Sequence, residues 1–169
     1  MSRVVVTLIA AVSEDGFISK GKGVPWHLPE DRAHFRRYTA GKWLLLGRIT
    51  FEEMHGWFRD HTPLVMTRDA GYEPVIGRRV SSVAEAIALA EQAGESELVV
   101  CGGGQIYAEA MPCAHRLMIT HVAARLGSGV PFPAITPVEW RRTHVEAHEG
   151  SPAFRIEQYD RPGSVVQVA

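Results

Sequence analysis

The sequence is short of several features that mark specialised proteins. Only two of its 169 residues are cysteines, Cys101 and Cys113, and they have neither metal-ligand spacing nor a disulfide-rich pattern. The formal net charge is -1, whereas a duplex-binding surface usually carries a basic excess. These scarcities predict a reduced, cytoplasmic setting, no metal site and no nucleic-acid partner.

Long apolar runs are also missing. The run 4–12 is interrupted by Thr7 and is too short to cross a bilayer, so we expect neither a membrane anchor nor a signal peptide. With 46% hydrophobic residues, the chain is long enough for one sizeable core and short for two. We therefore expect a monomer with one domain over residues 1–160 and a loosely held tail over residues 161–169.

What the sequence does contain is an alternation of strand-type and helix-type segments. One predicted helix begins at Pro29, and two others begin at the capping boxes Thr50-Glu53 and Ser82-Glu85. After a loop over 127–133, two segments alternate as antiparallel strands do. The prediction is an α/β fold, a single domain with a central, mostly parallel twisted sheet, antiparallel C-terminal strands and helices on both faces. The predicted strands are 4–12, 42–47, 63–67, 97–101, 116–123, 140–146 and 153–159.

The segment 24–35 places an acid among large apolar side chains at the start of a predicted helix. Phe35 follows Asp31 by four residues, so the acid shares a helix face with an aromatic ring, and Trp26 lies close by. A carboxylate on such a face is costly to bury and is tolerated mainly where it binds or protonates something. Asp31 is therefore the candidate functional acid, whereas Glu30 suits the positive end of the helix dipole.

Two arginines follow predicted strands. Arg48 stands where the strand 42–47 passes into a helix, and Arg68 follows the strand 63–67. If these strands are parallel neighbours, both side chains can converge on one anion at the sheet edge. The alternative, a capped helix with a nearby arginine and no ligand, stays open at this point.

Three glycines join the strand 97–101 to a short helix. Gly102, Gly103 and Gly104 let the backbone approach a ligand and aim N–H groups at a diphosphate, although the spacing differs from that of a Rossmann turn. A tight turn without a ligand is the alternative. The polar segment 13–23 is too flexible for a core and is a candidate mobile lid.

Taken in order, these motifs resemble dihydrofolate reductases of the bacterial type, from about Val4 to Tyr159. The resemblance rests on the segments 24–31, 47–50, 102–107 and 117–121. It implies reduction of 7,8-dihydrofolate to tetrahydrofolate, with NADPH giving hydride to C6 and the acid matching Asp31 helping to supply the N5 proton. It also implies small-molecule partners, namely dihydrofolate or a related pterin and antifolate inhibitors.

The resemblance also assigns individual residues. Trp26 would help to order water near the reacting edge, and the segment 13–23 would close over the nicotinamide. Arg48 and Arg68 would favour the 2′-phosphate of NADPH over NADH. The pterin pocket would be lined by Ile9, Ala10, Asp31, Phe35, Met54 and Thr120. The cofactor would be held by Ala11, Ile18, Gly47, Arg48, Ile49, Thr50, Thr67, Arg68, Cys101, Gly102, Gly103, Gly104, Gln105, Ile106 and Tyr107.

The chain departs from the family at two places. His61 stands where the family has an arginine that grips the α-carboxylate of the folate glutamate tail, and we expect Arg32 or Arg59 to compensate. The loop 127–129 lacks the acid that often pins the lid. We therefore expect a lid that is looser or differently braced.

The missing arginine keeps other functions open. One is the related NADPH-dependent reductase of riboflavin synthesis, which acts on a ribosylated aminopyrimidine, and another is reduction of a tail-less dihydropterin. The segment 13–18 resembles the riboflavin enzyme, whereas 25–31 favours the folate enzyme. A non-catalytic nucleotide-binding module is a third possibility, against which the intact Asp31 and Trp26 count.

Overall fold

The computed structural model describes residues 3–21 and 25–163, and an eight-stranded sheet forms its centre. The strand order is β5-β4-β3-β6-β1-β7-β10-β9, and the first six of these strands run parallel. Strand β10 is antiparallel to β7 and to β9. The predicted α/β fold with antiparallel C-terminal strands is confirmed. The bounds are β1 (Val5–Ser13), β3 (Trp43–Gly47), β4 (Thr62–Met66), β5 (Arg78–Val80), β6 (Glu97–Gly102), β7 (Arg116–Val122), β9 (Arg141–His148) and β10 (Phe154–Asp160).

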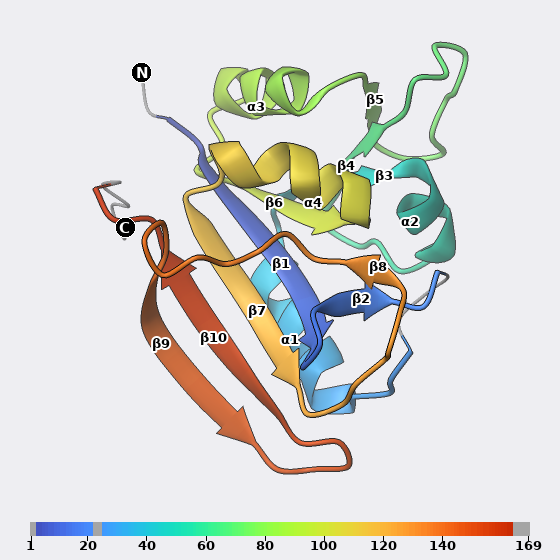
Figure 1. Cartoon of the computed structure of the whole chain (residues 1–169). Coiled ribbons are helices and arrows are strands. Elements are labelled where there is room, and N and C mark those ends of the chain that lie inside the picture. The colour runs from blue at the N-terminus through green and yellow to red at the C-terminus, as the bar shows by residue number, and fades with distance from the viewer. Residues whose placement is uncertain (1–2, 22–24, 164–169) are drawn as a thin grey trace.

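Helices cover both faces of the sheet. On one face, α3 (Val83–Gln92) and α4 (Gly104–Ala110) pack on side chains such as Leu8 and Leu45. On the other, α1 (Pro29–Thr39) and α2 (Arg48–Glu53) contribute Phe35 and Phe51 to a second core cluster. Figure 1 shows α4 in front of the sheet and α1 behind it. Because both faces are buried, the central strands are almost continuously apolar.

The helices begin where the chain supplies suitable first residues, with one exception. Helix α1 begins at Pro29, and at α3 the Ser82 hydroxyl accepts a 3.0 Å hydrogen bond from the Glu85 N–H. The predicted cap at Thr50 is wrong, because β3 passes directly into α2 at Arg48. Thr50 therefore lies inside the first turn of α2. None of the helices in the described ranges is long and apolar enough to span a membrane.

Two short strands lie within segments that the sequence predicted to be irregular. Strand β2 (Phe17–Ser19) falls within the predicted lid and pairs antiparallel with β8 (Val130–Pro131). The prediction of a loop over 127–133 is therefore wrong at β8. Gly129 permits the pairing, since a Cβ there would collide with the Ser19 carbonyl oxygen. Residues 22–23 of the predicted lid lie outside the described residues.

The start of the predicted C-terminal tail is attached to the domain. The Arg161 guanidinium donates 2.9 Å hydrogen bonds to the carbonyls of Ala114 and Met111 and lies 4.3 Å from the Trp140 ring centroid. A short 3₁₀ turn, Met111–Cys113, supplies one of these carbonyls. Residues 164–169 lie outside the described residues, so the loosely held tail stays a prediction there.

Candidate active site

A single carboxylate joins α1 to the end of β7. Asp31 lies in the first turn of α1, and Thr120 of β7 donates a 2.6 Å hydrogen bond from its hydroxyl to Asp31 Oδ1. Thr120 is only 3% exposed. This short hydrogen bond fixes the orientation of the Asp31 carboxyl group. The structure thus brings together two residues that the sequence assigned to one pocket.

An apolar cluster lies on the face of the sheet that α1, the helix of Asp31, covers. Ile9, Phe35, Met54 and Trp26 belong to the core cluster on the α1 face of the sheet. Ile9, Phe35 and Met54 were predicted to line the pterin pocket, and Trp26 was predicted to order water near the reacting edge. Ala10 differs, because the alternation along β1 turns it to the opposite side, where it borders the cofactor cleft described below.

The surroundings of Asp31 favour its protonated form. Burial raises the pKa of Asp31, while the Thr120 hydroxyl and the nearby His34 and His148 oppose that rise. Burial also lowers the pKa of His34, which favours its neutral form and weakens its opposition. Asp31 therefore keeps its proton to a higher pH than an ordinary aspartate, as a proton donor requires.

The indole of Trp26 adds an unsatisfied donor to the same region. Its Nε1 atom is buried and has no hydrogen-bond acceptor within the described part of the chain. A buried N–H needs an acceptor, because leaving it unpaired is costly. A water molecule or a polar substrate atom would meet this need.

A cleft of about 570 Å³ crosses the carboxyl ends of β4, β3, β6 and β1, within the range of about 300–1,000 Å³ typical of small-molecule sites. Arg68 is exposed and is not among the residues that line it. The other predicted cofactor residues do line it: Ala11, Ile18, Gly47, Arg48, Ile49, Thr50, Thr67, Cys101, Gly102, Gly103, Gly104, Gln105, Ile106 and Tyr107.

Glycines line the centre of the cleft. A Cβ on Gly47 would lie 3.4 Å from Ile106 and 3.8 Å from the Gly103 nitrogen, so the end of β3 and the start of α4 are in near contact. A Cβ on Gly104 would collide with Val130 Cγ1. Glycine at 104 avoids this collision, and the bare backbone of the turn leaves N–H groups accessible to a diphosphate.

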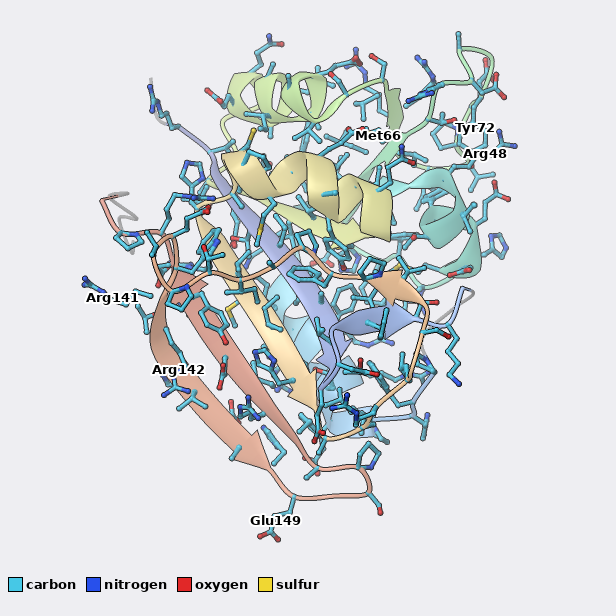
Figure 2. All side chains as sticks on the ribbon, in the orientation of Figure 1. Arg48, Met66, Tyr72, Arg141, Arg142 and Glu149 are labelled. Atoms are coloured by element: carbon cyan, nitrogen blue, oxygen red, sulfur yellow. The ribbon has the colours of Figure 1, made fainter. Side chains whose placement is uncertain are left out.

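At its outer end the cleft reaches Arg48, whose partners differ from those predicted. Arg48 Nε donates to Glu52 at 2.8 Å and its Nη1 donates to Asp69 at 3.2 Å. The guanidinium lies 4.2 Å from the Tyr72 ring centroid, and Figure 2 shows these two side chains together. The strands β3 and β4 are parallel neighbours, as the prediction required, but the side chain that reaches Arg48 from beyond β4 is the acid Asp69. The convergence of Arg48 and Arg68 on one anion stays a prediction.

Several lining residues were not predicted. Met66 ends β4, so the rule that ligands bind at the carboxyl ends of strands could have identified it. Val130 was not predicted because its strand, β8, was predicted to be loop, and no local sequence signal marks this residue as part of a site. The residues missed are Ser19, Gly21, Glu53, Met66 and Val130.

The lid segment carries its own brace. Asp15 accepts hydrogen bonds from the backbone N–H groups of Leu126 at 3.0 Å and Gly127 at 2.7 Å, and from the Ser13 hydroxyl at 2.7 Å. The Ser13 hydroxyl and these N–H groups hold the pKa of Asp15 well below its usual range. A different brace was expected, and the structure has one: the acid, Asp15, belongs to the lid segment 13–23, which we call the first loop. The second loop, 126–129, supplies N–H groups in place of the acid.

The rim where a folate tail would lie contains several cations. His61 does not reach outward, since its side chain is 2% exposed and stacks 4.7 Å from the Trp57 ring. Arg59 donates to the carbonyls of Gly56 and Phe58. Arg36, which the sequence did not single out, lies over Trp57 at 5.3 Å. Arg32 is also exposed, on α1.

Comparison with known proteins supplies the family. The family model described as dihydrofolate reductase matches residues 5–161. The chain belongs to the dihydrofolate reductase family. A dihydrofolate reductase of Neisseria meningitidis serogroup A is 39% identical over 137 residues, covering 80% of this chain and 83% of the relative. The type 3 enzyme of Salmonella typhimurium is 34% identical over 143 residues, covering 85% and 87%.

The fold comparison agrees with the sequence comparison. A solved dihydrofolate reductase from Enterococcus faecalis, complexed with NADP(H) and RAB-propyl, superposes with a TM-score of 0.85 at 29% identity. The match covers 95% of this chain and 98% of that one. The protein is an NADPH-dependent oxidoreductase that reduces dihydrofolate to tetrahydrofolate, and the alternatives are not favoured.

Proposed function

We propose that Asp31 is the acid through which this dihydrofolate reductase supplies a proton to N5 of the pterin. The observation that carries the proposal is the 2.6 Å hydrogen bond between Thr120 and Asp31, set in an apolar cluster beside the cofactor cleft. Strand β1 joins the two sites, because Ile9 faces the acid's cluster while Ala10 and Ala11 line the cleft.

The residues around Asp31 have separate tasks in this proposal. Thr120 orients the carboxyl group, which in its protonated form has one O–H to donate and can still accept hydrogen bonds from the amino group and ring nitrogen of a pterin. The Trp26 N–H orders a water molecule at the reacting edge. When bound, NADPH supplies the hydride that C6 accepts. Burial of the apolar cluster excludes bulk water from the reacting atoms.

The order of the strands supports one direction for the cofactor. The nicotinamide has to lie near Asp31, and so near β1 and β7, where Ala10 and Ala11 line the cleft. The glycine turn at Gly103 and Gly104 follows β6 and suits the diphosphate. Arg48, beyond β3, then receives the adenosine end with its 2′-phosphate.

The substrate tail is proposed to lie over the rim of α1. Arg32 and Arg59 are the cations expected to take its carboxylates, and the position of Arg36 over Trp57 adds a third. His61 is excluded from this role by its burial. Such a rim would bind the tail through exposed charges, which is weaker than a bidentate buried fork.

The setting of the enzyme is proposed on general grounds. Two free cysteines fit a reduced, cytoplasmic compartment, and one domain with a core cluster on each face of its sheet fits a monomer. Antifolate binding at the pterin pocket follows from the shape of the proposed site, because a flat diaminopyrimidine can pair with Asp31 as a pterin does.

Comparing three substrates tests the function. NADPH oxidation is measured with dihydrofolate, with a tail-less dihydropterin and with the ribosylated aminopyrimidine of riboflavin synthesis. We expect the highest kcat/KM with dihydrofolate, a higher KM with the dihydropterin and no turnover of the aminopyrimidine. Turnover of the aminopyrimidine alone would contradict the proposed function.

A further inference from the structure

Both signs of charge meet at the outer end of the cofactor cleft, where Arg48 lines the cleft and its ion-pair partner Asp69 lies beside it. Arg48 begins α2, directly after β3, and Asp69 lies three residues beyond the end of the neighbouring strand β4. Their side chains meet at 3.2 Å, between Arg48 Nη1 and Asp69 Oδ2. Thr67 lines the cleft and is uncharged. It fixes the turn, because its Oγ1 accepts a hydrogen bond from the Asp69 N–H.

The position of Asp69 is built by the local backbone. Asp69 Oδ1 accepts a 3.0 Å hydrogen bond from the Gly71 N–H, and the Asp69 carbonyl accepts one of 2.8 Å from Arg79 Nε. The other carboxylate oxygen is thereby directed at Arg48. Tyr72, in the same turn, stacks on the guanidinium and restricts where it can move.

These two side chains prefer different nucleotides. A guanidinium suits the 2′-phosphate of NADPH, whereas a carboxylate in the same place suits the free 2′-hydroxyl of NADH. A phosphomonoester carries about −1.5 to −2 charges near neutral pH, so a carboxylate beside it is repulsive. Arg48 and Asp69 lie within one hydrogen bond of each other, so any ribose that reaches one is close to the other.

We propose that Asp69 is a specificity-determining residue that moderates the enzyme's preference for NADPH over NADH. In the free protein it holds Arg48 in place. With NADPH it opposes the 2′-phosphate, and with NADH it accepts a hydrogen bond from the 2′-hydroxyl. The inference rests on the proposed direction of the cofactor, with its adenosine end at Arg48.

The test is Asp69→Asn, which removes the charge but keeps Oδ1 as the acceptor for the Gly71 N–H. The ratio of kcat/KM for NADPH to that for NADH should rise about tenfold, the size expected for one exposed charge beside a dianion. Calorimetric titration with NADP⁺ and NAD⁺ should show the same change in the ratio of Kd values. An unchanged ratio in a variant with an unchanged Tm would overturn the inference.

Two further variants separate the possible causes. Glu73→Gln makes the same change of net charge at an exposed position of the same loop, and it should leave the ratio as it is. If it raises the ratio equally, net charge and not Asp69 is responsible, and the inference fails. Arg48→Ala should weaken NADP⁺ binding and leave NAD⁺ binding unchanged. No effect of Arg48→Ala on NADP⁺ would refute the proposed direction of the cofactor itself.

Discussion

The two ends of the active site differ in how their charged groups are held. Asp31 is fixed by one short hydrogen bond from the nearly inaccessible Thr120, and its helix α1 packs on an apolar cluster. The side chain of Arg48 is 43% exposed and forms ion pairs with Glu52 and Asp69, whose side chains are more than half exposed. Buried groups keep their partner, whereas exposed pairs contribute little and exchange readily. Substitutions around Asp31 should therefore alter turnover, whereas those around Arg48 should alter which nucleotide binds.

The sharpest test of this contrast is Asp31→Asn. Loss of the proton donor should lower hydride-transfer turnover near neutral pH by about 10²–10⁴-fold, while Kd for NADPH stays unchanged. If the protonated acid is the active form, as proposed, turnover of the parent enzyme should fall as pH rises through the pKa of Asp31. Because that pKa is raised, the fall begins above the range of an ordinary aspartate.

Single-turnover rates measured over a pH series check both statements. The Asp31→Asn enzyme should lose this pH dependence as well as its rate, and NADPH titration serves as the control for folding. Parent-like turnover in the variant would remove Asp31 from the mechanism.

A second test alters the shape of the cofactor half without altering charge. Gly104→Ala should raise Kd for NADPH about tenfold, because the new methyl group collides with Val130, and overpacking typically costs about 1–3 kcal/mol. Adding Val130→Ala provides space and should restore much of the affinity. Fluorescence titration of the three proteins measures this, and no recovery in the double variant would show that the collision is not the cause.

The smallest effect is expected at the rim. The double variant Arg32→Ala, Arg59→Ala should raise KM for dihydrofolate about two- to fivefold, as expected for exposed charge pairs, and should leave KM for a tail-less dihydropterin unchanged. Arg36→Ala, measured alongside, tells whether the third cation shares the task. A normal KM for dihydrofolate in the double variant would refute compensation by these two arginines.

The sequence allowed much of the fold to be predicted because periodicity is a local signal. Strands covered on both faces are apolar at every position, and Pro29 marks the start of α1. Strands β2, β5 and β8 were missed because two or three residues carry no period, and β2 and β8 form only by pairing across more than a hundred residues.

The parts of the site that are formed by the backbone could be predicted from the sequence. The glycines of the turn and the strand ends lie where the order of motifs places them. Side-chain partners could not be predicted in this way. Nothing local indicates that Asp69 and not Arg68 reaches Arg48, because that choice depends on the turn fixed by Thr67 and Gly71.

The brace at Asp15 has a consequence for how these loops can change over time. On the second loop its partners are main-chain N–H groups of Leu126 and Gly127, so the attachment needs no particular side chain there, although the positive φ of residue 127 favours glycine. Apart from the positive-φ glycines Gly127 and Gly129, the second loop can therefore vary in sequence while the attachment survives, provided that its backbone course and the carboxylate at position 15 are kept. A comparison of sequences that looked only for paired side chains would find no covariation between the two loops and would overlook that they are joined.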